Sequence, residues 1–301
     1  GSATLTVGDS GVASVGGGIR VGTGGSGNLT VAAGGTVTTP GAVVLGVAAN
    51  SVGQLTVSGA GALLRADRLE VSANGTGMLT VQNGGQLELA SALTSETGSA
   101  TTSFIRVTGA NSKITAGSLS AASLYLEDGA SLVTRNGATL KDTRIVLPNG
   151  DTQTALLMSG TGTQWANDGL LALRAKADIS GAARISTDDL LVTGGINAST
   201  GSPNITDDRV WVSGTGSAIS ARGNITVGAD GTEPYGLLIA SNDARIEAGG
   251  EFNLTENGFL VLGGIANATS WNSAARSFTW DLATGAGALS GAPINMAVNS
   301  G

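Results

Sequence analysis

Short runs of alternating apolar and polar residues recur along the chain, each bounded by Gly, Asn or Ser. Alternation with a period of two predicts β-strands, and the bounding residues predict turns. None of these runs has the spacing of an amphipathic helix. The clearest members form one series of triplets: Leu5-Thr6-Val7, Leu29-Thr30-Val31, Leu55-Thr56-Val57, Leu79-Thr80-Val81 and Ile105-Arg106-Val107.

Successive triplets start 24, 26, 24 and 26 residues apart, and two kinds of unit alternate. One kind has a glycine pair after the triplet, as in Leu29–Val37 and Leu79–Leu87. The other kind starts 50, 51 and 54 residues apart. Its members are Val57–Leu64, Val107–Ile114, Met158–Trp165 and Val212–Ile219. A repeat of this length predicts a stacked solenoid built from two alternating coils.

Each triplet is flanked by two further short apolar runs. Those before it include Ile19–Val21, Val43–Leu45 and Leu69–Val71, and those after it include Thr36–Thr38, Leu63–Arg65 and Gln86–Leu89. Three strands in a coil of about 25 residues predict an all-β fold, the right-handed parallel β-helix, with about twelve coils. Equivalent strands would pair at roughly 4.8 Å per coil. Because one coil cannot enclose its own apolar face, stability must come from stacking.

The repeat predicts one elongated domain with distinct ends. Residues 3–265 form the expected β-helix, within which the Ser/Thr-rich stretch Ala92–Ser103 is expected to bulge as a corner loop. From 266 to 301 the period is lost and larger aromatic residues appear, so this part is expected to be a terminal coil or cap, or else part of a following segment. Residues 1–2, Gly-Ser, look like a cloning scar.

Composition agrees with a narrow solenoid. The 301 residues include 49 glycines but only four Trp, two Tyr and four Phe, and 12% are charged. A thin core has room for Val, Leu, Ile and Ala, and its corners need residues such as Gly and Asn that tolerate positive φ. A hydrophobic content of 41% at strand spacing argues against disorder.

Charge and missing residue types exclude several functions. The net charge of −7 gives no support for a general role in binding nucleic acid or another acidic polymer. There is no Cys, which excludes a disulfide framework and thiolate metal sites, and no His. No apolar run approaches the roughly 18 residues of a membrane helix. No residue pattern predicts a metal or a cofactor, and the RTX calcium pattern is absent.

Two motifs that suggest enzymes fail on their context. Gly8-Asp9-Ser10-Gly11 resembles the surroundings of a serine-protease nucleophile, but the chain has no histidine to accept the serine proton. Residues Gly22–Gly27 fit the G-x-G-x-x-G dinucleotide pattern. They run from strand to strand, whereas pyrophosphate binding needs a following helix N-terminus.

The densest acidic positions are the candidate binding residues Asp188, Asp189, Asp207 and Asp208, with Arg209 beside them. Clustered carboxylates and a basic group would suit a calcium-dependent polysaccharide lyase, and paired carboxylates would suit a glycosidase. Such sites need a cleft with long loops and aromatic walls, and the loops here are short. The alternative is that these are solvated corner residues that keep the solenoid soluble.

Four tryptophans offer a second kind of candidate surface. Trp165 occupies a repeat position that holds Leu64 or Ile114 in other coils, which predicts a core position. Trp211, Trp271 and Trp280 could stack on sugars.

The units L-T-V-x-x-G-G-x-V and V-S-G-x-G-S-x-I/L resemble repeats in the passenger domains of type V autotransporters, especially AIDA-type self-associating adhesins of Gram-negative bacteria. The resemblance covers roughly residues 3–265 and is specific to a repeat class. It implies a β-helix secreted through an outer-membrane β-barrel and displayed at the cell surface, anchored to the outer membrane. It carries no catalytic motif onto this chain.

The resulting hypothesis is a non-enzymatic surface adhesin without cofactors. Its partners would be the same domain on a neighbouring cell, or a protein or glycan of a host surface, and not nucleic acid. Many weak contacts in register would give avidity, leading to cell aggregation or biofilm. Two alternatives stay open: a β-helical polysaccharide-degrading enzyme that uses the acidic region, and a stalk that holds a binding tip elsewhere.

Overall fold

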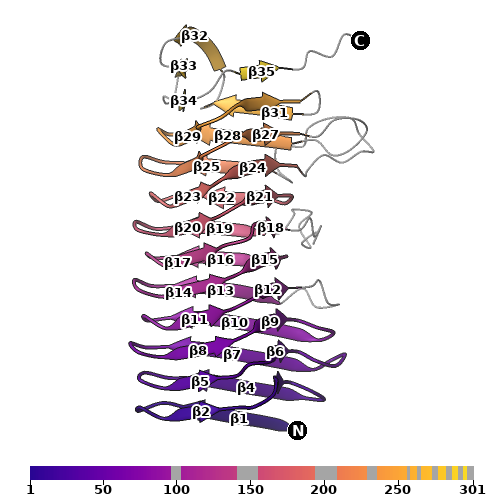
Figure 1. Ribbon diagram of the computed structural model, residues 1–301. Coiled ribbons are helices and arrows are strands. Elements are labelled where there is room, and N and C mark those ends of the chain that lie inside the picture. The colour runs from indigo at the N-terminus through magenta and orange to yellow at the C-terminus, as the bar shows by residue number, and fades with distance from the viewer. Residues whose placement is uncertain are drawn as a thin grey trace. The chain divides into compact units, whose positions relative to one another are not determined.

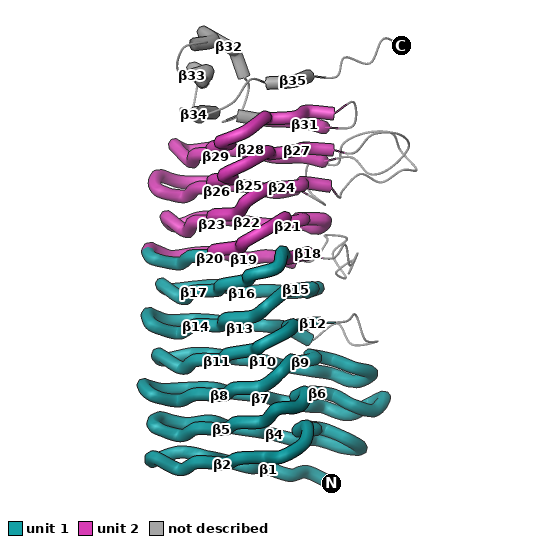
Figure 2. Tube along the Cα trace, viewed as in Figure 1, with its two compact units in different colours: residues 1–137, 162–165 teal, residues 138–161, 166–301 magenta. Residues whose placement is uncertain are grey.

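The computed structural model describes residues 1–95, 103–140, 155–193, 209–228, 236–255, 258–262, 266–272, 277–282, 287–290 and 294–296; beyond residue 260 the description is confined to the backbone. All regular elements in these ranges are β-strands. The chain divides into two compact units, residues 1–137 with 162–165 and residues 138–161 with 166–301 (Figure 2). Each unit is described by itself.

Unit 1 is a parallel β-helix in which the chain visits three sheets in turn (Figure 1). Sheet A contains β1 (Ser2–Val7), β4 (Ser26–Val31), β7 (Val52–Ser58), β10 (Thr76–Gln82), β13 (Phe104–Thr108) and β16 (Leu124–Glu127). Sheet B contains β2 (Val12–Ser14), β5 (Thr36–Thr38), β8 (Leu63–Ala66), β11 (Gln86–Leu89), β14 (Lys113–Ala116) and β17 (Ser131–Thr134). Sheet C contains β3 (Ile19–Val21), β6 (Ala42–Leu45), β9 (Arg68–Val71), β12 (Ala92–Ser95) and β15 (Ser118–Ala121).

Unit 2 repeats the same three-sheet arrangement. Its sheet A contains β19 (Leu156–Ser159), β22 (Ala177–Ile179), β25 (Val210–Ser213), β28 (Gly236–Ser241) and β31 (Gly258–Leu262). Its sheet B contains β23 (Arg184–Thr187), β26 (Ala218–Ala221), β29 (Arg245–Ala248) and β34 (Gly287–Ser290). Its sheet C contains β18 (Ala138–Leu140), β21 (Leu170–Leu173), β24 (Asp189–Val192), β27 (Ile225–Val227), β30 (Phe252–Leu254) and β35 (Ile294–Met296). The sheet B strand β20 (Gln164–Asn167) is divided between the two units.

The last part of the chain changes its pairing. β32 (Ala266–Asn272) pairs antiparallel with β33 (Ser277–Leu282), and β33 pairs antiparallel with β34. In the rest of the described chain the strand pairs are parallel. The antiparallel strands begin at residue 266, where the sequence period is lost.

The repeated triplets stack in register, as their spacing predicts. In sheet A of unit 1, Leu5, Leu29, Leu55, Leu79 and Ile105 are successive partners. Leu29 is 2% exposed and Ile105 is fully buried, because alternate residues of a strand face the inside of the coil. Burying such a side chain contributes about 2 kcal/mol, which a single coil could not obtain alone. One expectation is wrong: Ala92–Ser95 is strand β12, with Leu93 buried in the core, and residues 96–102 lie outside the described ranges.

Two turn geometries at the corner from sheet A to sheet B explain why two coils alternate. One has two consecutive residues with positive φ, as at Asn83 and Gly84. The other has positive φ at two positions separated by one residue, as at Gly109 and Asn111. Gly, Asn and Asp tolerate this region best. The protease-like motif at residues 8–11 belongs to the first geometry, since Asp9 and Ser10 both have positive φ and Gly11 N donates to Gly8 O at 2.8 Å.

At three turns of the second kind, a buried hydroxyl joins the turn to a turn of the first kind. Ser112 Oγ accepts a hydrogen bond from Gly84 N at 3.0 Å, and Thr163 Oγ1 accepts one from Gly129 N at 2.9 Å. In unit 2, Ser217 Oγ accepts one from Ala182 N at 3.0 Å. All three hydroxyl residues are fully buried. At the Gly59–Gly61 turn the position holds Ala62, and Gly34 N donates instead to the backbone oxygen of Ala60 at 3.0 Å. The alternation of coils therefore provides acceptors for corner N–H groups.

Candidate functional site

The acidic residues Asp188 and Asp189 occupy the corner between sheets B and C of unit 2, where β23 ends and β24 begins. Asp188 Oδ2 accepts a hydrogen bond from Gly169 N at 2.6 Å. Asp189 Oδ1 accepts one from Asn224 N at 2.7 Å. Gly169 precedes β21 and Asn224 precedes β27, the two strands that pair with β24. Both carboxylates therefore bind corner N–H groups of neighbouring coils, which is a structural role.

Arg222 links this corner across three coils. Its Nη2 lies 2.5 Å from Asp188 Oδ1 and 3.0 Å from Asp168 Oδ1. Each of these residues directly follows a sheet B strand, so equivalent repeat positions place them in one column. The sequence prediction missed Asp168 and Arg222, although comparing the residues that follow equivalent runs of the repeat would have identified them. The Arg222 side chain is 68% exposed, so these ion pairs contribute little to stability.

Arg209 does not join the acidic corner. It immediately precedes β25 in sheet A, where its Nη2 lies 3.8 Å from Asp178 Oδ1. Its Cζ lies 5.0 Å from the centre of the Trp211 ring, a cation–π distance. Asp207 and Asp208 lie outside the described residues. Among the described members of the predicted group, Asp188 and Asp189 share a corner, and Arg209 has partners on another sheet.

The Asp188→Ala substitution distinguishes the two interpretations of this corner. We expect a loss of about 1 kcal/mol in the free energy of unfolding, because Gly169 N loses its acceptor. The shift of the urea unfolding midpoint measures this effect. Asp168→Ala is the matched control, since Asp168 contacts the same arginine at the surface, and it should leave the midpoint nearly unchanged. A wild-type activity on acidic polysaccharides that Asp188→Ala abolishes without a change in midpoint would support the enzyme instead.

The tryptophans separate into core and surface. Trp165 is fully buried, which confirms the predicted core position, and its Nε1 donates to Thr134 Oγ1 at 3.1 Å. Trp211 is half-buried on the outer face of sheet A in unit 2, and its Nε1 donates to Ser241 Oγ at 2.8 Å. The side chains of Trp271 and Trp280 lie outside the description. Trp211 is therefore the described tryptophan that could contact a partner.

A second aromatic group lies on the outer face of sheet A in unit 1. The Arg106 Cζ lies 5.9 Å from the centre of the Phe104 ring and 5.3 Å from that of the Tyr125 ring. The two rings meet edge to face with centroids 6.3 Å apart. Arg106 Nε also lies 3.3 Å from Glu127 Oε2. These contacts fix the arginine against its own sheet and leave an amphipathic patch.

Before this patch, the same outer face carries a ladder of threonines. Thr6, Thr30, Thr56 and Thr80 are successive partners, and Arg106 is the next one. Thr6 is exposed and the other three threonines are half-buried. The ladder therefore presents hydroxyl groups in one line on a strand surface, at roughly 4.8 Å intervals.

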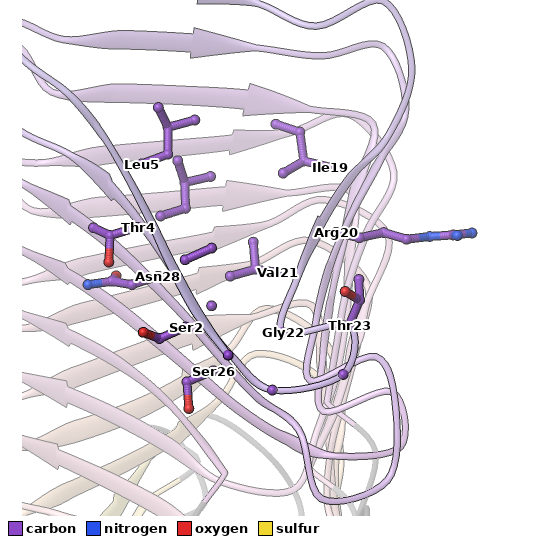
Figure 3. Close-up of a pocket in the computed structure, with 16 residues that line it drawn as sticks. Ser2, Thr4, Leu5, Ile19, Arg20, Val21, Gly22, Thr23, Ser26 and Asn28 are labelled. Atoms are coloured by element: carbon purple, nitrogen blue, oxygen red, sulfur yellow. The ribbon is translucent and has the colours of Figure 1, made fainter.

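The described residues of unit 1 line two hollows that bear on ligand binding. One, of about 590 Å³, lies at the first coil beside β1, β3 and β4, with Leu5, Ile19 and Val21 among its apolar lining (Figure 3). The other, of about 650 Å³, lies on the outer face of sheet C, between Arg20 and Glu70. Arg20 points away from the first hollow (Figure 3), so its guanidinium group belongs to the outer face.

The dinucleotide-like segment Gly22–Gly27 leads from β3 into the first residues of β4 without a helix, as the sequence predicts. Within the described ranges, no three His, Cys, Asp or Glu side chains group closely enough to hold a metal ion. The same ranges contain no helix long and apolar enough to cross a membrane. Comparisons with protein-family models, with curated proteins and with solved structures found no match for this chain.

Proposed function

We propose that this chain is part of a bacterial surface adhesin, a passenger region of the AIDA-type autotransporter kind. The β-helix would be displayed at the outer membrane and would attach cells to one another, or to a host surface, through the outer faces of its coils. The proposal combines the repeat resemblance with the parallel β-helix fold. It assigns no catalytic role to the acidic residues, because Asp188 and Asp189 are used to bind corner N–H groups.

The threonine ladder of sheet A is the observation that carries the proposal. Side chains of Thr30, Thr56 and Thr80 repeat at one register position, so a second copy could contact each coil in the same way. One hydrogen bond between hydroxyl groups contributes about 1 kcal/mol at most. Several such bonds in register, multiplied over many copies on a cell, give strong attachment without a deep pocket.

A charge-insertion experiment tests the role of this face. The wild-type domain is displayed on non-aggregating bacteria beside a Thr30→Arg/Thr80→Arg variant, and settling of the culture measures aggregation. Arg106 occupies the same ladder position naturally, so the fold accepts arginine there. We expect the variant to slow aggregation at least tenfold, because like charges then face each other between copies.

The matched control places the same charges on sheet B of the same two coils. Thr36→Arg/Gln86→Arg changes β5 and β11 and should aggregate like the wild type. Equal aggregation by all three proteins would remove sheet A as the contact face. A wild-type domain that neither aggregates cells nor attaches them to host surfaces, and that sediments as a monomer at all concentrations, would contradict the adhesin and favour a stalk.

A further inference from the structure

The outer face of sheet C in unit 1 contains a hollow. It forms because long and short side chains alternate at one register position of successive strands. Arg20, Val44 and Glu70 are successive partners in β3, β6 and β9. The long charged side chains of Arg20 and Glu70 therefore lie one coil to either side of the short apolar side chain of Val44. In the neighbouring column Ala42 pairs with Arg68, which again sets a short side chain beside a long one. The short side chains of the middle coil leave a space of about 650 Å³.

Loops that connect sheet C to sheet A form one side of the hollow. Val47 belongs to the loop after β6, and Ala73 and Asn74 belong to the loop after β9. Asn74 Nδ2 donates to Val47 O at 3.1 Å, which holds the two loops together. Because the amide nitrogen is used in this way, Asn74 Oδ1 remains as an acceptor at the rim. The hollow is therefore bounded by two neighbouring columns of side chains on sheet C and by the two linked loops.

The charged groups of the hollow are available to a ligand. Within the described part of the chain, neither Arg20 nor Glu70 has a side-chain hydrogen bond or ion pair. Successive rungs are roughly 4.8 Å apart, so the backbones that carry these two residues are about 10 Å apart. Arg68 pairs with Asp67 at 3.4 Å on the surface, where water weakens the interaction. Arg20, Arg68 and Glu70 thus line a space with an apolar floor, and the Asp67 carboxylate lies beside Arg68.

We propose that this hollow binds a sugar residue that carries a carboxylate, as part of an acidic surface glycan. The ligand carboxylate would accept hydrogen bonds from the Arg20 and Arg68 guanidinium groups, for which a planar carboxylate is the matching partner. Sugar hydroxyl groups would donate to the Glu70 carboxylate and to Asn74 Oδ1. The C–H face of the ring would cover Val44. A space of this size lies within the usual range for small-ligand sites.

The mixture of charges favours this ligand over other acidic or uncharged ones. An acidic peptide would bring a second carboxylate toward Glu70, and like charges repel. A neutral sugar would leave the Arg20 guanidinium group with water alone as a partner, while Arg68 would keep its surface pair with Asp67. A sugar acid supplies one carboxylate and several hydroxyl donors on one rigid ring, which matches the unpaired Arg20 and the surface-paired Arg68 beside the Glu70 carboxylate.

This inference deepens the proposed adhesin function, on which it rests, by naming a ligand class. The test uses the full chain and a trimer of α-1,4-linked galacturonate in a calorimetric titration. Arg20→Gln should weaken binding about tenfold, because one charge-assisted hydrogen bond to the ligand carboxylate is lost. Glu70→Gln should weaken it less, since an amide oxygen still accepts from a hydroxyl group.

Arg135→Gln is the matched control, because it removes the same charge from an exposed position elsewhere in unit 1. It should bind the trimer like the wild type. No binding of the trimer by the wild type, equal binding by all variants, or equal binding of a neutral galactose trimer or a tri-aspartate peptide would overturn the inference. Cell aggregation is measured in parallel. If the wild type does not bind the trimer but still aggregates cells, the hollow alone is rejected, whereas trimer binding by a wild type that attaches no cells rejects the adhesin alone.

Discussion

Replacing Trp165 by alanine is expected to lower the free energy of unfolding by about 4 kcal/mol. Trp165 has the largest fully buried side chain among the described residues, and its Nε1 donates to Thr134 Oγ1 at 3.1 Å. The substitution removes that hydrogen bond and leaves a cavity that the narrow coil cannot close, because parallel strands hold the rungs at a fixed spacing. Thermal and urea unfolding followed by circular dichroism measure the loss.

Trp165→Leu is the control for this prediction, since Leu64 occupies the corresponding position of another coil of the same kind. It keeps most of the apolar contact and should cost about 2 kcal/mol. Trp211→Ala provides a comparison on the surface, where half-burial predicts a smaller cost. If the free energy of unfolding of Trp165→Ala lies within about 1 kcal/mol of the wild-type value, the core position contributes less to stability than its burial indicates.

Sequence predicted the coil correctly because period-two alternation and turn residues constrain the fold at every rung. A shift of one residue in the pairing of Leu29 with Leu55 would move every apolar side chain of the strand to the outside. The register therefore follows directly from the pattern. Positive φ at Asn83 and Gly84 likewise follows from residue type. Such local features were predictable without knowledge of distant partners.

Contacts between coils were not predictable in the same way. The hydrogen bond from Gly84 N to Ser112 Oγ joins residues that belong to different turns, and only the stacked structure shows it. The same limit applies to Asp188, whose sequence neighbours do not include its partner Arg222. The sequence placed Asp188 and Arg209 in one candidate group, but each lies at a different corner with its own partners.

The hollow on sheet C was missed for a related reason. Arg20 and Glu70 are separated by two coils, and the repeated runs that contain them, Ile19–Val21 and Leu69–Val71, were interpreted only as strands. Their relation appears only when the ladder through Val44 is traced. A search of the sequence for charged residues at equivalent repeat positions, on either side of a short residue, would have found it. Solenoids allow such a search because register converts sequence spacing into distance.

Replacing Gly53 by alanine is the second large effect that we expect, at about 3 kcal/mol of destabilisation. Gly53 is buried near the start of β7 in sheet A, just after the connection from sheet C, and it does not have positive φ. A Cβ there would lie well inside contact distance of the backbone atoms Gly46 N and Val21 O. Backbone atoms of neighbouring rungs cannot move aside as a flexible side chain would. This glycine is therefore required by close approach and not by its own dihedral angles.

Gly24→Ala is the matched control, because Gly24 is exposed, lacks positive φ and faces open space where the alanine Cβ would lie. It should leave the urea midpoint unchanged or slightly raised, since alanine reduces the entropy of the unfolded chain. Gly53→Ala should lower the midpoint and increase amide exchange in β7, whose ladder passes through this residue. Equal midpoints for the two variants would mean that the rungs can separate locally at little cost. In that case the coils would pack less tightly around Gly53 than the short distances to Gly46 N and Val21 O indicate. The outer faces of unit 1 would then be less rigid near this residue than a fixed rung spacing implies.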